Sequence, residues 1–519
     1  MLTRRDSPLG AWPPASREGL AAASGVLLFL SFPKFGHGSV AFVALVPLLL
    51  ALPGAAGWRA LGLGWITGAI WSLGTLYWTA YVVVQYGGLS LPVGIAVMAL
   101  LCLAVALFPA LFAWTLARWI EAVGPPALLA APVAWVATEI LRAHTFFRFP
   151  WCLLGYSQHQ HLPVLQLAAL AAVYGVSFVV AGCSGGLAYL MLERRPVPRR
   201  RVLLTLGVLA AAVWGGGSWW LSRPLPEAPA LRVGLVQASI LQEDKWDPAQ
   251  AVENVHRHLD LTLAAVDRGA RLVVWPESSV PFYFDRSPDL AEQLRRLVQE
   301  RRIYLLFGND DRLDGPGGAY RVWVGAKMLA PSGDLALRYH KIRLVPFGEY
   351  VPMQPLLTLG GRLTAKLVRE VADFTPGSRP SIGRVDGHAL GAFICYEAIF
   401  PDLVRRFAIE GATLLVNITN DGWYGRTSAP HQHLAMARFR AVENGVYLVR
   451  AANTGITAVI DARGRLLEQT RLFERAALVR EVPLVQGATF YRRHGDVFAW
   501  CCLASAALAT LGTLGRRGC

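Results

Sequence analysis

Long apolar runs occupy most of the first 222 residues and recur near the C-terminus. They fall at about 20–33, 39–54, 60–83, 90–119, 125–142, 163–192, 202–222 and 496–514. Several approach the roughly 20 residues that a helix needs to cross a bilayer, and the first two are short enough to form a re-entrant pair. The first run lacks a small-residue cleavage site followed by a polar region, so we interpret it as a retained helix and not as a signal peptide. The pattern predicts a membrane α-helical bundle of about eight transmembrane helices.

A different pattern begins after the Pro-rich segment Ser222–Pro229. Short apolar stretches that are typical of strands alternate there with helical stretches. The strands are expected at Leu231–Ala238, Arg271–Trp275, Ile303–Phe307, Leu390–Cys395 and Thr413–Ile418, and the helices at Ala249–Val266 and Leu290–Arg301. This alternation predicts an α/β domain whose catalytic loops follow strand ends. We therefore expect transmembrane helices in 1–223, an α/β catalytic domain in 224–490, and a last helix with a short tail in 491–519.

The composition supports a membrane protein and argues against a nucleic-acid partner. Of 519 residues, 54% are hydrophobic and only 16% are charged, which is too apolar for a purely soluble protein. Residues 224–490 carry 32 basic and 29 acidic side chains, a net charge of +3, whereas the apolar remainder carries 18 basic and 6 acidic, a net charge of +12. Most of the positive charge thus flanks the apolar runs, where it sets membrane orientation.

The basic residues of the short loops predict the orientation. With the N-terminus in the cytoplasm, twelve basic residues lie inside and six lie outside, as the positive-inside rule requires. Residues 224–490 then lie on the far side of the membrane. In a bacterium this is the periplasmic side of the inner membrane.

Three segments of the α/β domain carry side chains that suit nucleophilic catalysis. Glu277 follows the apolar strand that ends at Trp275, and taken alone it is more readily a solvated loop residue than a catalytic one. Lys341 lies among apolar and aromatic residues, with Glu349 eight positions later; such a lysine is either a snorkelling surface residue or a buried charge that needs a carboxylate. Cys395 ends a hydrophobic strand and precedes Tyr396 and Glu397.

Cys395 stands apart from the other six cysteines, which lie in or beside apolar segments. No disulfide framework can form in the α/β domain, and a solitary cysteine is more often an inert small hydrophobe than a nucleophile. Together, however, the three groups form a coherent unit. Glu277 can take the thiol proton, Lys341 can stabilise the thiolate and an oxyanion, and Cys395 can carry an acyl group.

The order Glu277, Lys341, Cys395 resembles the catalytic triad of the nitrilase, or carbon-nitrogen hydrolase, superfamily over roughly residues 230–485. With membrane helices on both sides, the whole chain is similar to the membrane-embedded branch of that superfamily, the apolipoprotein N-acyltransferases. Further agreement lies in Gln242–Pro248, Val345–Pro352, Asn417–Gly425 and Arg450–Thr457. One departure is Tyr320-Arg321, where the family often has Tyr-Asn.

The resemblance implies a fold and a reaction. The fold is a nitrilase-like four-layer α-β-β-α sandwich. The acyl donor is a phospholipid, the acceptor is the diacylglyceryl-modified N-terminal cysteine of an apolipoprotein, and no metal or organic cofactor takes part. By the same resemblance Glu349 holds Lys341 in place, Glu397 supports the site, and Tyr396 offers its backbone N–H to the oxyanion. The expected mechanism is ping-pong, through a thioester on Cys395.

Several alternatives remain at this point. His431 and His433 do not have the spacing of metal ligands. Trp246, in a charged loop, is either core or a substrate-binding lid residue. Residues 352–375 form either an amphipathic helix on the core or a lipid-facing lid. A membrane-anchored amidase or nitrilase is the alternative function, and a transporter fits less well because intramembrane acids other than Glu139 are scarce.

Overall fold

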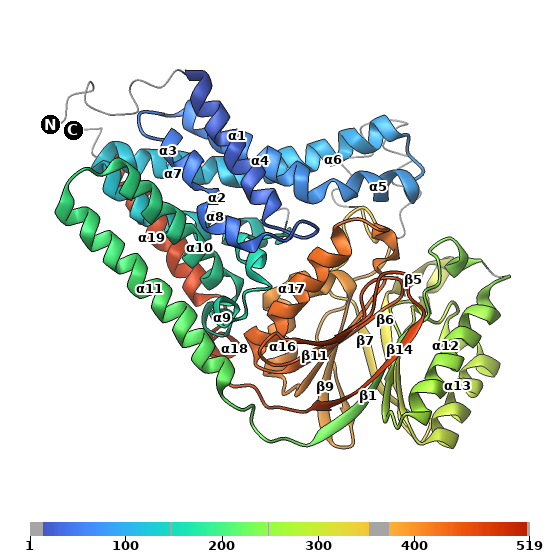
Figure 1. Cartoon of the computed structure of the whole chain (residues 1–519). Helices are drawn as coiled ribbons and strands as arrows, with labels where there is room; N and C mark the ends of the chain where they lie inside the picture. The colour runs from blue at the N-terminus through green and yellow to red at the C-terminus, as the bar shows by residue number, and fades with distance from the viewer. Residues whose placement is uncertain (1–13, 146–147, 248, 352–372, 516–519) are drawn as a thin grey trace. The chain divides into compact units, whose positions relative to one another are not determined.

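The computed structural model of the chain describes residues 14–145, 148–247, 249–351 and 373–515. The chain forms two compact units, whose elements are labelled in Figure 1. The first contains residues 1–224, 427–439 and 494–519, and the second contains residues 225–426 and 440–493. The sequence places 427–439 inside the α/β domain, whereas the structure groups this segment with the helices.

The described residues of the first unit form helices joined by short loops. Its helices are α1 Pro14–Leu30, η1 Gly38–Val40, α2 Ala41–Ala44, α3 Val46–Ala51, α4 Trp58–Leu76, α5 Trp78–Gln85, α6 Leu91–Val105, α7 Leu107–Val123, η2 Pro125–Ala130, α8 Ala131–His144, η3 Leu154–Gln158, α9 Leu162–Leu165, α10 Ala168–Leu192, α11 Pro196–Ser222 and α19 Val497–Gly515. Small residues let α4 approach α7 closely. A Cβ on Gly64 would lie 2.3 Å from the Pro109 carbonyl oxygen, and one on Gly68 would lie 2.8 Å from Ala106 Cα, so a larger residue at either position would force the two helices apart.

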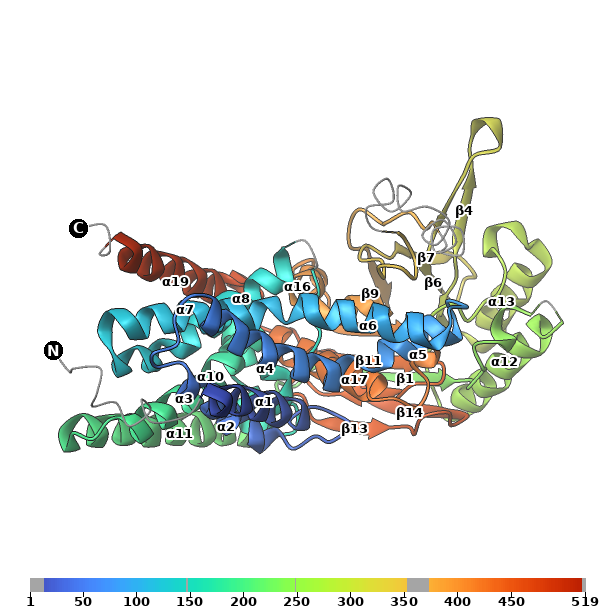
Figure 2. The same ribbon diagram turned by 90° about the horizontal axis from the view of Figure 1, so that it is seen from above.

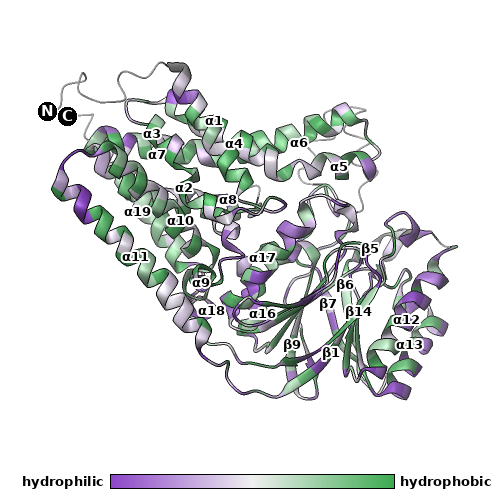
Figure 3. Ribbon diagram, in the orientation of Figure 1, coloured by the Kyte–Doolittle hydropathy of each residue, from purple (hydrophilic) through white to green (hydrophobic). Residues whose placement is uncertain are grey.

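Hydrophobic residues dominate these helices (Figure 3). Among the described residues, five helical segments are long and apolar enough to cross a membrane: Leu91–Val123, Pro125–His144, Ala168–Leu192, Pro196–Ser222 and Val497–Leu514. Gly38–Ala51 is a shorter apolar helix. The N-terminal region is therefore helical with several apolar helices, while the expected number of eight crossings stays a prediction.

Helix α17, Ala429–Asn444, begins within the helical unit. Gln432 connects it to three other parts of that unit. Its side-chain N–H groups donate to the carbonyls of Pro33 (2.9 Å) and Thr75 (3.1 Å), and its Oε1 accepts from the Trp151 indole at 2.8 Å. These bonds satisfy polar groups that would otherwise be buried without partners.

The second unit contains two six-stranded mixed sheets. In the first sheet the strand order is β14-β1-β2-β3-β6-β7, and in the second it is β13-β12-β11-β10-β9-β8. The central strands β1, β2 and β3, and likewise β9, β10 and β11, run parallel, and the outer pairs are antiparallel. A separate ribbon of β4 and β5 extends away from the sheets (Figure 2). The strands are β1 Ala230–Gln237, β2 Leu272–Val274, β3 Tyr304–Gly308, β4 Asp311–Asp314, β5 Tyr320–Trp323, β6 Gly325–Leu329, β7 Leu335–His340, β8 Ile382–Val385, β9 His388–Ile394, β10 Leu414–Thr419, β11 Tyr447–Ala452, β12 Ala458–Ile460, β13 Leu466–Gln469 and β14 Ala476–Pro483.

The two sheets lie face to face, with β1 against β11, β6 against β9 and β7 against β8. Helices cover the outer faces. Leu294 and Val298 of α13 pack with Trp275 and Phe307 in the core of the first sheet, and α12 packs on β1. On the second sheet, Phe407 of α16 contacts Phe393 of β9, with ring centroids 6.1 Å apart. The layers therefore run helix, sheet, sheet, helix. The helices of this unit are η4 Asp244–Trp246, α12 Ala251–Asp267, η5 Phe284–Arg286, α13 Pro288–Arg301, η6 Pro316–Gly318, η7 Cys395–Ile399, α16 Pro401–Ile409, η8 Asp421–Tyr424, the end of α17 and α18 Phe490–His494.

Candidate active site

Three strand ends supply the three residues of the predicted catalytic unit. Glu277 follows β2 by three residues, Lys341 directly follows β7, and Cys395 directly follows β9. Glu277 and Lys341 thus come from the first sheet and Cys395 from the second. The face-to-face packing of the sheets brings the three groups into one buried cluster, in which Glu277 and Lys341 both act electrostatically on the thiol.

Cys395 occupies a strained turn between β9 and the short helix η7. Its backbone φ is +49°, a left-handed conformation that residues other than glycine rarely adopt and that is frequent at functional sites. Glu397 caps this turn, because its Oε2 accepts a hydrogen bond from the Ile394 N–H at 2.7 Å. The thiol is therefore held at a fixed position at the strand end.

The Lys341 ammonium is buried between two carboxylates. Its Nζ lies 3.0 Å from Glu277 Oε1 and 2.5 Å from Glu349 Oε1, and its side chain has no exposed surface. Burial by itself lowers the pKa of Lys341, but the charges of Glu277 and Glu349 outweigh it and raise this pKa well above the ordinary value. Lys341 therefore stays a cation.

Glu349 fixes Lys341 from the loop that follows β7. Its second oxygen, Oε2, accepts a hydrogen bond from the Val345 N–H at 2.9 Å. Burial raises the pKa of Glu349, the Lys341 ammonium opposes this shift, and the Glu277 carboxylate adds to it. The ammonium thus keeps two acids of like charge side by side.

Glu277 is oriented through its other oxygen and through its backbone. Its Oε2 accepts from the Asn420 N–H at 2.9 Å, and its carbonyl accepts from Lys245 Nζ at 2.8 Å. Asn420 is held in turn by Gln242, whose Oε1 accepts from the Asn420 side-chain amide at 2.7 Å. One carboxylate oxygen of Glu277 thus faces Lys341 while the other is fixed by the loop after β10.

Cys395 is a protonated thiol in the resting site. Its residue is 4% exposed, and burial is the main cause that raises its pKa above the ordinary value. Glu277 raises the pKa further, while Lys341 and the Thr419 hydroxyl lower it. A nucleophilic reaction of this thiol therefore needs a base, and Glu277 is placed to serve as one.

Two charged residues of the cluster were missed as site residues. Lys245 is buried, and this burial lowers its pKa to about 8 against the opposing charge of Glu277. Asp310, two residues after β3, has a buried Oδ1 without a hydrogen-bond partner among the described residues. Burial and the charges of Glu277 and Glu349 raise the pKa of Asp310 to about 7. Lys245 lies within the stretch Gln242–Pro248 that agrees with the family, but no pattern in the sequence marks either Lys245 or Asp310 as a site residue.

Tyr396 and Trp246 are the remaining residues that the sequence predicts for the site. Tyr396 is buried directly after the thiol, with its ring 5.2 Å from that of Phe400. Trp246 ends the short helix η4, but its side chain lies outside the described part, as do 352–372 of the expected amphipathic segment. Among the described residues no group of three or more His, Cys, Asp or Glu side chains is placed to hold a metal ion.

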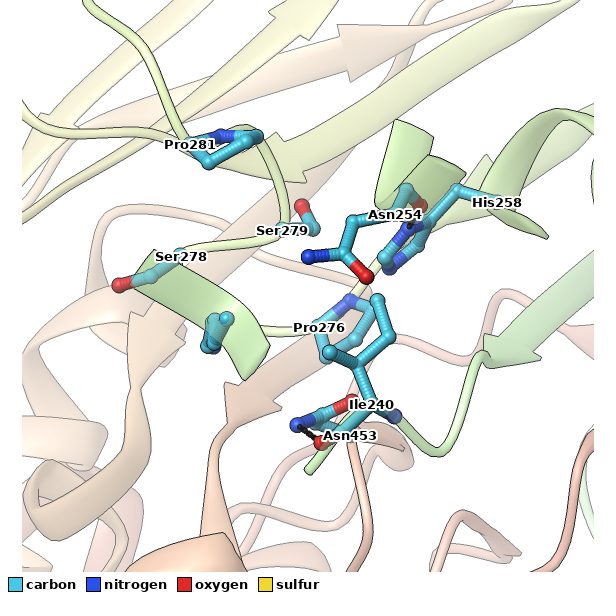
Figure 4. Close-up of a pocket in the computed structure, with 9 residues that line it drawn as sticks. Ile240, Asn254, His258, Pro276, Ser278, Ser279, Pro281 and Asn453 are labelled. Carbon is cyan, nitrogen blue, oxygen red and sulfur yellow. Dashed lines mark hydrogen bonds between the residues drawn. The ribbon is translucent and has the colours of Figure 1, made fainter. Parts of the chain in front are cut away.

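A small cavity lies beside the Glu277 loop (Figure 4). It is lined by Lys245, Asn254, His258, Pro276 and Ser278, among others, and its volume is about 10 Å³. This is room for about one water-sized group and not for an acyl chain. The His258 ring lies 4.8 Å from that of Trp275, and burial lowers the pKa of His258 to about 4. The His258 ring is therefore uncharged at neutral pH.

Both the helical part and the α/β part of the chain match known protein families. Residues 24–186 match the family model of the apolipoprotein N-acyltransferase N-terminal domain, and residues 232–491 match that of the carbon-nitrogen hydrolases. The apolipoprotein N-acyltransferase of Geobacter metallireducens is 41% identical over 96% of this chain and 95% of its own, and that of Azotobacter vinelandii is 35% identical over 95% and 93%. An amidase structure from Nesterenkonia sp. matches at 22% identity with a TM-score of 0.38, over 51% of this chain and 95% of that one. Since the relatives match through the helices and the α/β part alike, the chain belongs to the apolipoprotein N-acyltransferase family of the carbon-nitrogen hydrolase superfamily.

Proposed function

We propose that this enzyme transfers a fatty acyl group from a phospholipid to the α-amino group of the N-terminal S-diacylglyceryl cysteine of apolipoproteins, through a thioester on Cys395. The observation that carries the proposal is the Lys341 ammonium, held 3.0 Å from Glu277 and 2.5 Å from Glu349 in the cluster that contains the buried thiol. Glu277 is thus a preorganised base and Lys341 a preorganised cation beside the nucleophile Cys395.

In the first half-reaction Glu277 takes the proton of the Cys395 thiol. The thiolate attacks the carbonyl carbon of a phospholipid ester, and the negative charge that develops on the carbonyl oxygen is stabilised by Lys341 and the backbone N–H of Tyr396. The C–O bond then breaks. The leaving alkoxide takes the proton from Glu277 and departs as lysophospholipid, and the acyl group remains on sulfur.

In the second half-reaction the α-amine of the acceptor attacks the thioester carbonyl. Glu277 removes a proton from the attacking nitrogen, the C–S bond breaks, and the proton returns to the thiolate of Cys395. An amine attacks a thioester readily, and the amide product is too stable to reverse the step. In both halves Glu349 holds Lys341 in position, and Glu397 holds the turn of Cys395.

Trp246 belongs to this proposal as a substrate-binding or lid residue. Its chain neighbour Lys245 donates to the Glu277 carbonyl at 2.8 Å, and this bond ties the segment that carries Trp246 to the Glu277 loop. The amphipathic character of tryptophan suits contact with a lipid substrate.

The membrane arrangement follows from the charge pattern. The proposal has eight transmembrane helices in the inner membrane, seven in 1–223 and one in 491–519, with the catalytic part 224–490 on the periplasmic side. Under this orientation, twelve basic residues outside the catalytic part lie on the cytoplasmic side and six lie on the periplasmic side, which supports the proposal by the positive-inside rule. A reporter fused near Asp311 should respond as periplasmic and one near Arg199 as cytoplasmic; the reverse pattern would overturn the orientation.

Intact-protein mass spectrometry tests the chemistry. After incubation with a phospholipid of known chain length, the wild-type protein should gain the mass of one acyl group, released by hydroxylamine as a thioester is. Cys395→Ala should gain none, and the matched control Cys501→Ala, at an exposed position of α19, should gain the same mass as wild type. Near-normal transfer by Cys395→Ala would end the covalent mechanism.

A further inference from the structure

A groove runs between α1, α2, α3 and α10 of the helical unit. Its volume is about 700 Å³, and its wall is made of apolar side chains with a single charged residue, Arg199 at the start of α11. Val43 and Met191 on this wall are 43% and 63% exposed. The other apolar residues that line it include Leu27, Val46, Leu187 and Leu190.

Positive charge gathers at the end of the groove where Arg199 lies. Residues 193–201 contain five arginines and one acid, Glu193, and the charged beginning of α11 stands out against its apolar remainder (Figure 3). Glu193 already pairs with Arg195 at 2.7 Å. Arg199 donates one hydrogen bond, to the Glu193 backbone carbonyl at 3.0 Å, and forms no ion pair with an acid among the described residues.

The helix beside the groove is covered very little by protein. Only 6% of the apolar window of α11 is buried, against 56% for α10. Leu203, Leu204 and Val208 in its first half are 62%, 59% and 67% exposed. This exposed apolar flank suits contact with acyl chains, and the Arg199 guanidinium beside it, which has no ion pair among the described residues, suits a phosphate.

We propose that this groove binds one anionic glycerophospholipid, with its phosphate at Arg199 and an acyl chain along the apolar wall. In the proposed orientation this lipid belongs to the cytoplasmic leaflet. This lipid stays bound and is not the acyl donor, because the lining residues that the structure describes include no nucleophile and no acid. The surplus arginines repel the ammonium of a zwitterionic head group, so the site prefers a head group with net negative charge.

Native mass spectrometry of the full-length protein in detergent tests this. All measurements use the Cys395→Ala background, so that no lipid is consumed and the result does not depend on the proposed reaction. The protein is titrated with dioleoylphosphatidylglycerol and, separately, with dioleoylphosphatidylethanolamine. One phosphatidylglycerol should bind about tenfold more tightly than phosphatidylethanolamine, and Arg199→Gln should remove most of that difference. Arg118→Gln, on α7, is the matched control and should keep it.

A second variant probes the apolar wall. Val46→Trp fills the groove while all the arginines remain, so it should also lose the bound lipid, and it decides the question if Arg199→Gln fails to fold. Glycerol 3-phosphate, which has no acyl chain, should not displace the lipid. Equal retention of the two lipids by the parent protein, unchanged phosphatidylglycerol binding in both variants, or displacement by glycerol 3-phosphate would each overturn the proposal.

Discussion

The Tyr339 hydroxyl donates a hydrogen bond of 2.7 Å to Glu397 Oε1, and this bond ties the end of β7 to the turn that carries Cys395. The same oxygen accepts from the backbone N–H groups of Ile342 (2.6 Å) and Arg343 (3.1 Å), which directly follow Lys341. Glu397, which lies in the short helix η7, thus sets the position of the Lys341 ammonium relative to the Cys395 thiol.

Glu397→Gln should lower the activity more than Tyr339→Phe, which removes the side-chain hydroxyl that donates to Glu397. A Gln side chain has one N–H donor group where the carboxylate has an acceptor, so it confronts a backbone N–H with another donor whichever way it points. We expect acyl transfer to fall by at least about tenfold, together with a lower Tm. Tyr339→Phe loses one neutral donor and should keep most of its activity. The rates and thermal unfolding of the two variants provide the check, and an inactive Tyr339→Phe beside an active Glu397→Gln would contradict this account.

Glu349→Gln should make the enzyme lose activity at a lower alkaline pH than the wild type does. The pKa of Lys341 is raised well above its ordinary value because the charges of Glu277 and Glu349 outweigh burial. With one of the two carboxylates neutral, burial is offset less and this pKa falls. Lys341 then loses its proton, and with it the oxyanion stabilisation, at a lower pH.

The measurement is a pH–rate profile of both proteins, carried from neutral pH as far into the alkaline range as both stay folded, because the pKa of Lys341 in the wild type lies well above its ordinary value. The rate of Glu349→Gln should fall off at a lower alkaline pH than the rate of the wild type. At neutral pH the rate of the variant should be reduced by about tenfold. Glu292→Gln, an exposed residue of α13 paired with Arg296, is the control. Superimposable alkaline limbs would show that Glu349 does not hold the charge of Lys341.

Asp310→Asn should stabilise the protein at alkaline pH. Burial and the charges of Glu277 and Glu349 raise the pKa of Asp310 from 3.8 to about 7. The folded state therefore favours the protonated acid, and the stability contributed by that proton is complete below about pH 4 and lost as the pH rises through about 7. Asn imitates the neutral acid at every pH.

The Tm of Asp310→Asn should exceed that of wild type by about 2–4 °C or more near pH 8.5, and by less near pH 5.5. Asp260→Asn, an exposed residue paired with Arg475 at 3.0 Å, should show a small difference that is the same at both pH values. A wild-type protein that is the more stable of the two near pH 8.5 would mean that Asp310 is charged and paired.

The sequence predicts the buried parallel strands β1, β2, β3, β9 and β10 because they are continuous apolar runs. It does not predict β11, Tyr447–Ala452, which is interrupted by the charged Arg450. The expected strand Leu231–Ala238 corresponds to β1, Ala230–Gln237, and Thr413–Ile418 corresponds to β10, Leu414–Thr419. The β4–β5 ribbon was not predicted, because its strands are mostly exposed and polar and do not repeat an apolar pattern. The ends of helices shift by one or two residues for the usual reason, since end residues are held by few bonds.

The residues of the candidate site likewise divide into those that the sequence indicates and those that only the fold reveals. Glu277 and Cys395 each follow a strand that the sequence predicts, whereas Lys341 follows β7, which it does not predict. The order of the three residues along the chain is what resembles the superfamily. Asp310 and Lys245 enter the cluster only through contacts between loops distant in sequence, and no local pattern indicates such contacts. Gln432 is similar: the sequence marks the polar triplet around it, but only the fold shows that its amide serves the carbonyls of Pro33 and Thr75.

The order of events at the thiol separates a transferase from a hydrolase. If donor and acceptor react in sequence through a thioester, phospholipid alone should release about one equivalent of lysophospholipid per enzyme, because the acyl group then waits on Cys395. A diacylglyceryl-modified peptide with a free N-terminal amine should restart turnover. The same peptide with an acetylated amine should not, because the lone pair that attacks the thioester is no longer available. A membrane-anchored hydrolase would instead release fatty acid continuously without acceptor, since water completes the second half-reaction. Fatty-acid release as fast as the peptide-supported transfer would therefore refute the transferase assignment, even if Glu277, Lys341 and Cys395 all proved essential.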